Sequence, residues 1–319
     1  MTRSIFSTPS AWVHTVRMRS KSPVWCRFFM LLLWLPGGVQ AAINVFTCEP
    51  EWAALATELG GDRLEIYSAT TAQQDPHHIQ ARPSLIAKAR KAELLICTGA
   101  ELEIGWLPLL LRKAGNARIR PGQPGHFLAT EHVALLEKPE KLDRSLGDIH
   151  ASGNPHVHTD PRNILIIARY LYQRLIQIDQ DHADIYTQRF EAFARDWQTA
   201  IRKWSSQLAV ANGAVVVVHH DYWSYLIAWL GLDRIATLEP LPGVSPSSSH
   251  LARVKQLMKQ QQVVMIIDTS YMNDRPAKWL FEQTGVPVVS LPATVDYQSG
   301  ANLYHWFDSL VELIREHVK

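Results

Sequence analysis

The 319-residue sequence has only three cysteines, and it lacks an apolar run of the roughly 18–20 residues that a membrane-spanning helix requires. It also lacks the C-x-x-C, H-E-x-x-H and G-x-S-x-G patterns that mark compact zinc sites, zinc proteases and serine hydrolases. The missing apolar run argues against an integral membrane protein. The missing motifs mean that any site must be assembled from distant segments by the fold.

The beginning of the chain has no acidic residue through position 41 and follows the order of a secretory signal. Five basic side chains precede a short apolar run at 28–35 and a small-residue site that ends at Ala41. We therefore expect residues 1–41 to be a cleaved signal peptide and the mature protein to be periplasmic. Cys48 lies well past the apolar run, which makes it a poor site for lipid attachment.

Removing this segment changes the charge of the protein. The whole chain has 32 Lys and Arg against 30 Asp and Glu, and five of the basic residues leave with residues 1–41, so the mature charge is 27 − 30 = −3. No basic stripe remains to neutralise phosphates, and nucleic-acid binding is not expected.

Cys48 and Cys97 remain, each at the end of an apolar run, and they form either a disulfide or two buried thiols.

Short apolar runs alternate with amphipathic stretches along the mature chain, which predicts parallel sheets flanked by helices. Strands are expected at 43–47, 64–68, 94–97, 214–218, 263–267 and 286–291, with helices at 50–59, 83–91, 106–114, 222–230, 250–261, 276–284 and 301–318. No Gly or Pro occurs from 162 to 212, so this region is helical, as two helices or with one long backbone helix. We predict an α/β protein with an N-terminal lobe at 42–160, a linking helical region at 161–212 and a C-terminal lobe at 213–319.

Three segments rich in histidine stand out, and each lies after a strand or at a loop end, where open α/β sheets place ligands. They are Asp75-Pro76-His77-His78, the stretch Asn154-Pro155-His156-Val157-His158, and His219-His220-Asp221. Neutral imidazole is a common ligand of transition metals. Each histidine taken singly is more simply a polar surface or hydrogen-bonding residue, so the metal interpretation requires the three segments to converge.

The chain resembles the periplasmic metal-binding subunits of zinc and manganese ABC importers, the cluster A-I solute-binding proteins with a long helix between two lobes. The likeness covers residues 43–319 and consists of five segments in the family's order. They are D-P-H at 75–77, G-x-x-x-E-x-x-W-L from Gly99, N-P-H-x-x-x-D-P from Asn154, H-D-x-x-x-Y from His220 and E-P-x-P-G-x-x-P from Glu239.

The resemblance implies His77, His156 and His220 as metal ligands. It implies a carboxylate near the end of the last strand as the fourth ligand, for which Asp296 is the first candidate, with Asp268 or water as alternatives. His150 is a candidate auxiliary or entry ligand. Because neighbouring side chains of extended chain point to opposite sides, only one histidine of each close pair should face the ion, which sets aside His78, His158 and His219.

Three imidazoles and a carboxylate suit tetrahedral Zn²⁺, whereas manganese prefers more oxygen ligands. The resemblance thus implies a monomeric receptor that captures zinc as its transported ligand and passes it to a membrane ABC permease without any chemical reaction. Alternatives are a receptor for manganese or another divalent metal, and a secreted zinc-dependent hydrolase with Glu101 or Glu103 as base. A binding protein for an organic solute would use the aromatic cluster of Tyr222, Trp223, Tyr225 and Trp229.

Overall fold

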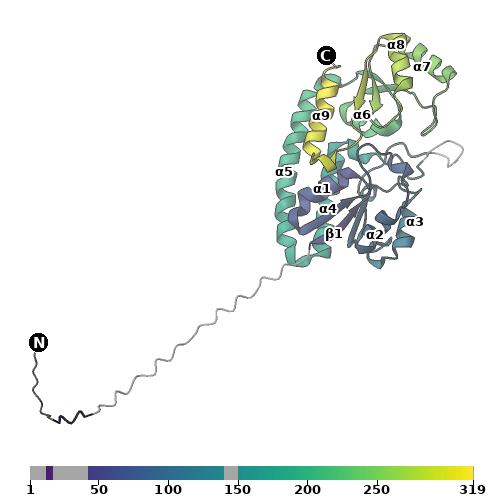
Figure 1. Cartoon of the computed structure of the whole chain (residues 1–319). Helices are drawn as coiled ribbons and strands as arrows, with labels where there is room; N and C mark the ends of the chain where they lie inside the picture. Colours follow the sequence, from purple (N-terminus) through teal and green to yellow (C-terminus); the bar gives the residue numbers. More distant parts are fainter. Residues whose placement is uncertain (1–11, 17–41, 140–149, 319) are drawn as a thin grey trace, which may run out of the picture. The chain divides into compact units, whose positions relative to one another are not determined.

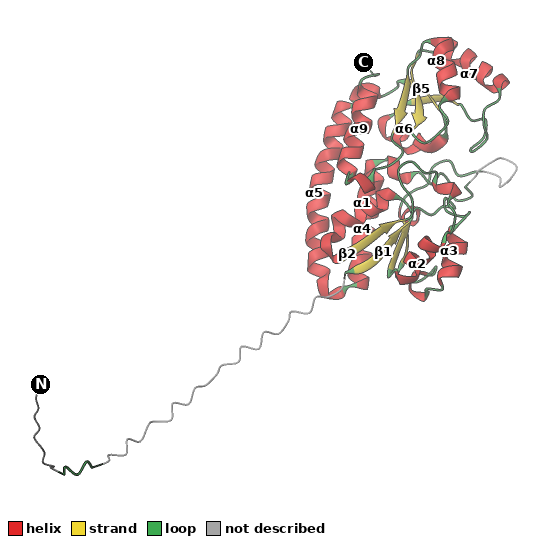
Figure 2. Ribbon diagram, in the orientation of Figure 1, coloured by secondary structure: helices red, strands yellow, loops and turns green. Residues whose placement is uncertain are grey.

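Two parallel four-stranded sheets organise the chain. The computed structural model describes residues 12–16, 42–139 and 150–318, so the predicted signal peptide lies largely outside the described residues. The first sheet has the order β2-β1-β3-β4, and the second has the order β6-β5-β7-β8. Helices lie on the faces of both sheets (Figures 1 and 2). The predicted two-lobe α/β fold is confirmed, and we call residues 42–160 the first lobe and residues 213–319 the second lobe.

The strands coincide closely with the predicted apolar runs, and two were not predicted. Edge strands β4 and β6 lack the continuous apolar pattern of the central strands, because an edge strand is only partly covered. The first sheet consists of β1 (Ile43–Thr47), β2 (Leu64–Ser68), β3 (Leu94–Cys97) and β4 (His126–Leu128). The second consists of β5 (Val215–Val218), β6 (Asp233–Thr237), β7 (Val263–Thr269) and β8 (Val288–Leu291).

Several helices begin where proline occupies the first turn, a position that needs no backbone donor. In the first lobe these are α1 (Pro50–Gly60), α2 (Pro83–Lys91) and α3 (Leu107–Ala114). The linking region contains α4 (Pro161–Ile178) and α5 (Ala183–Gln207). The second lobe contains α6 (Ser224–Leu230), α7 (Ser248–Gln260), α8 (Arg275–Thr284) and α9 (Leu303–Arg315). No helix within the described ranges is both long and apolar enough to cross a membrane.

The helical region breaks at Asp179 although it has neither glycine nor proline there. The Asp179 carboxylate accepts hydrogen bonds from the His182 Nδ1 at 2.8 Å and from the Tyr186 hydroxyl at 2.8 Å. Such local side-chain bonds compete with the helical pattern of the backbone. The region therefore folds as two helices, of which the 25-residue α5 contacts both α1 of the first lobe and α9 of the second (Figure 1).

One hydrophobic cluster is continuous across both lobes. It joins Ile43 and Trp52 of the first lobe to Trp197 of α5 and to Val216 and Phe307 of the second lobe. Each sheet also has one smaller hydrophobic cluster of its own, which packs helices against it. The lobes are therefore packed against each other through a shared core, in which burying each large side chain contributes on the order of 1.5–3 kcal/mol.

Cys48 and Cys97 form a disulfide, which resolves the two alternatives that the sequence left open. Strands β1 and β3 pair in parallel with Thr47 opposite Ile96, so the two cysteines that follow lie side by side. Their Cα atoms are 4.8 Å apart, and both side chains are fully buried. The bond ties the carboxyl ends of the two central strands of the first sheet together.

We predict that replacing both cysteines (Cys48→Ala with Cys97→Ala) lowers the free energy of unfolding by about 2–4 kcal/mol, because the closed loop of 49 residues no longer restricts the unfolded chain. Urea unfolding of the two proteins measures this loss. A reductant should destabilise the natural protein by a similar amount and leave the double variant unchanged. Equal stability of both proteins without reductant would contradict the prediction.

Candidate metal site

His77 is held in the short helical turn Pro76–His78 that follows β2 in the first lobe. The Asp75 carboxylate caps this turn by accepting a hydrogen bond from the His77 backbone N–H at 2.9 Å. The same carboxylate oxygen lies 2.7 Å from Nδ1 of the His77 ring. Nδ1 therefore donates to Asp75, and Nε2 is the nitrogen left to bind a ligand. A carboxylate behind an imidazole is the usual arrangement for a metal-binding histidine.

His156 lies at the junction of the lobes, just before α4. The Asn154 side chain accepts a hydrogen bond from the His156 backbone N–H at 2.9 Å and fixes the turn. The His156 side chain is 1% exposed, and its ring lies 4.0 Å from the ring of Tyr222 in the second lobe, between centroids. Neither ring nitrogen has a hydrogen-bond partner in the described part of the chain. A buried imidazole in this state is unsatisfied unless a ligand binds it.

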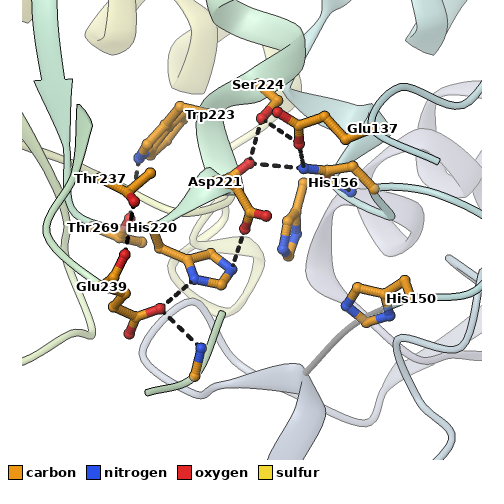
Figure 3. A network of polar contacts seen from close by, with 12 residues as sticks. Glu137, His150, His156, His220, Asp221, Trp223, Ser224, Thr237, Glu239 and Thr269 are labelled. Carbon is orange, nitrogen blue, oxygen red and sulfur yellow. Dashed lines mark hydrogen bonds and ion pairs between the residues drawn. The ribbon is translucent and has the colours of Figure 1, made fainter. Parts of the chain in front are cut away.

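His220 follows strand β5 of the second lobe and is bracketed by two acids (Figure 3). Its Nδ1 lies 2.7 Å from a Glu239 carboxylate oxygen, and its Nε2 lies 2.8 Å from a carboxylate oxygen of Asp221. The Glu239 carboxylate also accepts a hydrogen bond from the backbone N–H of Gly243. Glu239 thus orients His220 as Asp75 orients His77. The roles of Asp75 and Glu239 were not assigned from the sequence, although both stand in the segments that resemble the metal-receptor family.

The fold brings the three predicted histidines together. The ring centroids of His77 and His156 are 5.9 Å apart, and those of His156 and His220 are 5.8 Å apart. A pocket is lined by His77 of the first lobe and His220 of the second. The three rings therefore converge from two lobes, which is the condition that the metal interpretation required.

The ligand atoms are not yet at coordination spacing. Among the described residues, the only set of three potential ligand atoms within 4.8 Å of one another belongs to Cys48, Cys97 and Glu103, and a disulfide joins the two cysteines. For the three histidines to share one ion, small rotations would have to bring their rings together, and Nε2 of His220 would have to leave Asp221.

The electrostatics of the rings differ. Burial lowers the pKa of His156 well below its ordinary value, and the neighbouring His220 and His77 rings lower it further. Burial and the His77 ring lower the pKa of His150 to about 4. Burial also acts to lower the pKa of His220, but hydrogen bonds to Asp221 and Glu239 outweigh it and raise the pKa to about 10. At neutral pH a cation would meet unprotonated nitrogens at His156 and His150 and would displace a proton from His220.

The neighbouring histidines have other surroundings. The His78 side chain is 69% exposed, and it lines the rim of the same pocket as His77 and His220. His158 is buried with its Nε2 2.9 Å from the Tyr222 hydroxyl. His219 is buried with its Nδ1 2.7 Å from the Asp268 carboxylate. Asp268 is thus the partner of His219, and its carboxylate also accepts a hydrogen bond from the backbone N–H of Thr269.

The structure does not bring Asp296 to the three histidines. Strand β8 ends at Leu291, and Asp296 lies exposed at the start of the turn Tyr297–Ser299. The hydroxyl of the adjacent Tyr297 lies 3.0 Å from that of Thr57 on α1, where a different pocket opens. The expected fourth ligand therefore has its neighbours on another part of the surface, because the chain turns after the last strand toward α1.

The residues proposed for the rival functions have structural partners. Glu103 is buried and accepts hydrogen bonds from the backbone N–H groups of Thr98 and Gly99. Glu101 accepts one from the N–H of Ala151 at 2.8 Å. The aromatic residues Tyr222, Trp223 and Tyr225 are buried in the core and hydrogen-bonded within the protein.

A buried polar contact joins the lobes beside His156. The Thr294 hydroxyl of the second lobe donates to the Glu51 carboxylate of α1 at 2.6 Å, and both side chains are buried. The Tyr222 hydroxyl, next to His158, donates to the backbone carbonyl of Ala293 at 2.9 Å. These contacts hold the junction without any metal.

We predict that Thr294→Val lowers the free energy of unfolding by about 1–3 kcal/mol, since the buried Glu51 carboxylate loses a hydrogen bond that water cannot replace. Urea unfolding measures the change. The matched control is Thr199→Val, at an exposed position of α5, which should change stability by less than about 0.5 kcal/mol. Equal effects of the two substitutions would refute the importance of the contact.

Known proteins resemble this chain in both sequence and fold. The family model described as "ZnuA: Zinc-uptake complex component A periplasmic" matches residues 45–317. The manganese ABC transporter substrate-binding lipoprotein PsaA of Streptococcus pneumoniae is 20% identical over 251 residues, covering 77% of this chain and 78% of that protein. The zinc-binding lipoprotein AdcA of the same species is 20% identical over 265 residues, covering 82% of this chain and 52% of that protein. A crystal structure of ZnuA matches with a TM-score of 0.73 at 18% identity, covering 87% of this chain and 100% of that chain.

Proposed function

Because the chain belongs to the family of periplasmic zinc-uptake components, we propose that it captures Zn²⁺ between its lobes and delivers the ion to a membrane ABC permease. The chain is a metal-binding receptor of the zinc and manganese ABC type and not an enzyme. The proposed ligands are His77 and His156 of the first lobe and His220 of the second.

The state of His156 is the observation that carries this proposal. Its ring is buried, both nitrogens lack a partner among the residues described, and its lowered pKa keeps it neutral. Leaving a polar group buried and unbonded costs about 1–3 kcal/mol. A metal ion bound to one of the nitrogens would offset this cost. The rings of His77 and His220 lie beside it, and each has a carboxylate at Nδ1.

Zinc is proposed over manganese because the site is rich in imidazole. Imidazole suits zinc, copper and nickel, whereas manganese favours carboxylate, carbonyl and water oxygens. The relatives bear names of both kinds, manganese for PsaA and zinc for AdcA. The manganese receptor is therefore the second candidate, and competition between the two ions distinguishes it from the first.

The proposed location is outside the cytoplasmic membrane. The order of basic, apolar and small residues at 1–41 supports export, as do the family description as periplasmic and the relatives' names as lipoproteins. The Cys48–Cys97 disulfide suits an oxidising compartment. A monomer is proposed, because one chain supplies all three histidines.

We predict that His77→Ala, His156→Ala and His220→Ala each weaken zinc binding by at least about 100-fold, since each removes one ligand. Competition against a chromophoric chelator measures the affinity, and elemental analysis measures the metal content. His78→Ala, which removes an exposed imidazole next to a ligand, should leave the affinity within about twofold. Tight stoichiometric zinc in all three ligand variants would refute the site.

We further predict that Glu239→Gln weakens zinc binding by about 10- to 100-fold, because the amide no longer fixes the ring of His220 through a charge-assisted hydrogen bond. The same competition titration measures the effect. Glu312→Gln, at an exposed position of α9, removes an equal charge far from the site and serves as the control. An unchanged affinity of the Glu239 variant would show that this carboxylate does not orient the ligand.

A further inference from the structure

His150 lies against His77 at the spacing of two ligands of one ion. The Nε2 atoms of the two rings are 3.2 Å apart, and the ring centroids are 5.3 Å apart. Two nitrogens bound to the same tetrahedral zinc at 2.0–2.1 Å are about 3.3 Å apart. Because Nδ1 of His77 donates to Asp75, Nε2 of His77 carries the lone pair and accepts a hydrogen bond from Nε2–H of His150, a contact that a shared ion would replace.

The position of His150 is fixed by backbone contacts on its carboxyl side. The Ala151 N–H donates to the Glu101 carboxylate at 2.8 Å, and the Gly153 N–H donates to the His150 carbonyl at 3.1 Å. Glu101 itself has φ of 68°, a backbone conformation that residues other than glycine rarely adopt. Such strain persists where the surrounding structure holds it, and here it turns the Glu101 carboxylate toward Ala151.

The turn after His150 also depends on Gly153. This glycine has φ of 120°, and a Cβ there would lie 2.8 Å from the Leu135 side chain and 2.8 Å from the Leu136 carbonyl oxygen. The next backbone N–H, of Asn154, donates to that same carbonyl. The Asn154 side chain accepts a hydrogen bond from the His156 backbone N–H and so positions His156. One anchored segment therefore positions both His150 and His156.

We propose that His150 is the fourth ligand, so that four imidazoles and no carboxylate bind the captured ion. This inference rests on the proposed function and deepens it. It assigns to His150 the place that was expected for Asp296, which lies exposed on another part of the surface. Figure 3 shows His150 in the same group as His156, His220 and Asp221.

The chemical consequence concerns selectivity. A site with four neutral nitrogen ligands has no anionic oxygen to offer Mn²⁺, which prefers carboxylates and water. The same site suits Zn²⁺, and also Cu²⁺ and Ni²⁺. His150 is thus a specificity-determining ligand, and its loss should narrow the preference for zinc over manganese.

The test compares the natural protein with His150→Ala, using Zn²⁺ and Mn²⁺ salts as probes. X-ray absorption of the zinc-loaded proteins should show four nitrogen ligands with an imidazole pattern in the natural protein and three imidazoles with one water oxygen in the variant. Zinc affinity should fall by about 10- to 100-fold, and the affinity ratio of zinc to manganese should fall with it. His305→Ala, at an exposed position of α9, should change neither.

The outcomes separate this inference from the function on which it rests. An unchanged zinc affinity and an unchanged set of zinc ligands in His150→Ala would overturn the assignment of His150, while tight zinc in the natural protein would leave the receptor function standing. A natural protein that binds no stoichiometric zinc would overturn both. Thermal unfolding of the metal-free variant should match that of the natural protein, so that a lost ligand is distinguished from a misfolded chain.

Discussion

The burial of one unpartnered imidazole, that of His156, is the constraint around which the site is arranged. The ring is enclosed because residues 154–160 of the first lobe are buried and contact the second lobe. The Asn154 side chain donates to the Asp221 carbonyl at 2.8 Å, and the Tyr225 hydroxyl donates to the Asn154 carbonyl at 2.7 Å. Water cannot reach the ring, and no residue described here replaces it. The free energy of this arrangement favours a ligand that accepts the lone pair of an imidazole nitrogen, which a metal cation does.

The same junction determines how capture can proceed. The shared hydrophobic cluster and the Glu51–Thr294 bond hold the lobes together without an ion, and α5 packs against both. Opening the lobes like a hinge would expose this core, which costs on the order of 25 cal/mol per Å² of apolar surface. In the proposed function, metal binding requires only small ring rotations and the exchange of Asp221 for the ion at His220. This differs from receptors whose lobes close over a bulky solute.

The sequence was informative wherever local pattern decides structure. The apolar runs that became β1, β3 and β5 are buried central strands, and their short length and apolar composition between turn and helix signals identified them. The edge strands β4 and β6 were missed, because His126 and Asp233 interrupt any apolar pattern. The three histidine-rich segments stood out by composition and position, whereas the choice of His77, His156 and His220 within them came from the resemblance to one family and stays a prediction. The placement of Asp296 and His150 depends on long-range contacts of their neighbours, Tyr297 with Thr57 and Ala151 with Glu101, which no local pattern encodes.

Anomalous diffraction from crystals of the zinc-loaded protein tests the central claim most directly. The account predicts a single strong zinc peak at the lobe junction, within about 2.0–2.2 Å of a ring nitrogen of His156. It also predicts that the separation of the two sheets is unchanged from the metal-free protein, since the junction is already formed. A zinc peak that lies elsewhere, with the nitrogens of His156 still unbound, would contradict the account.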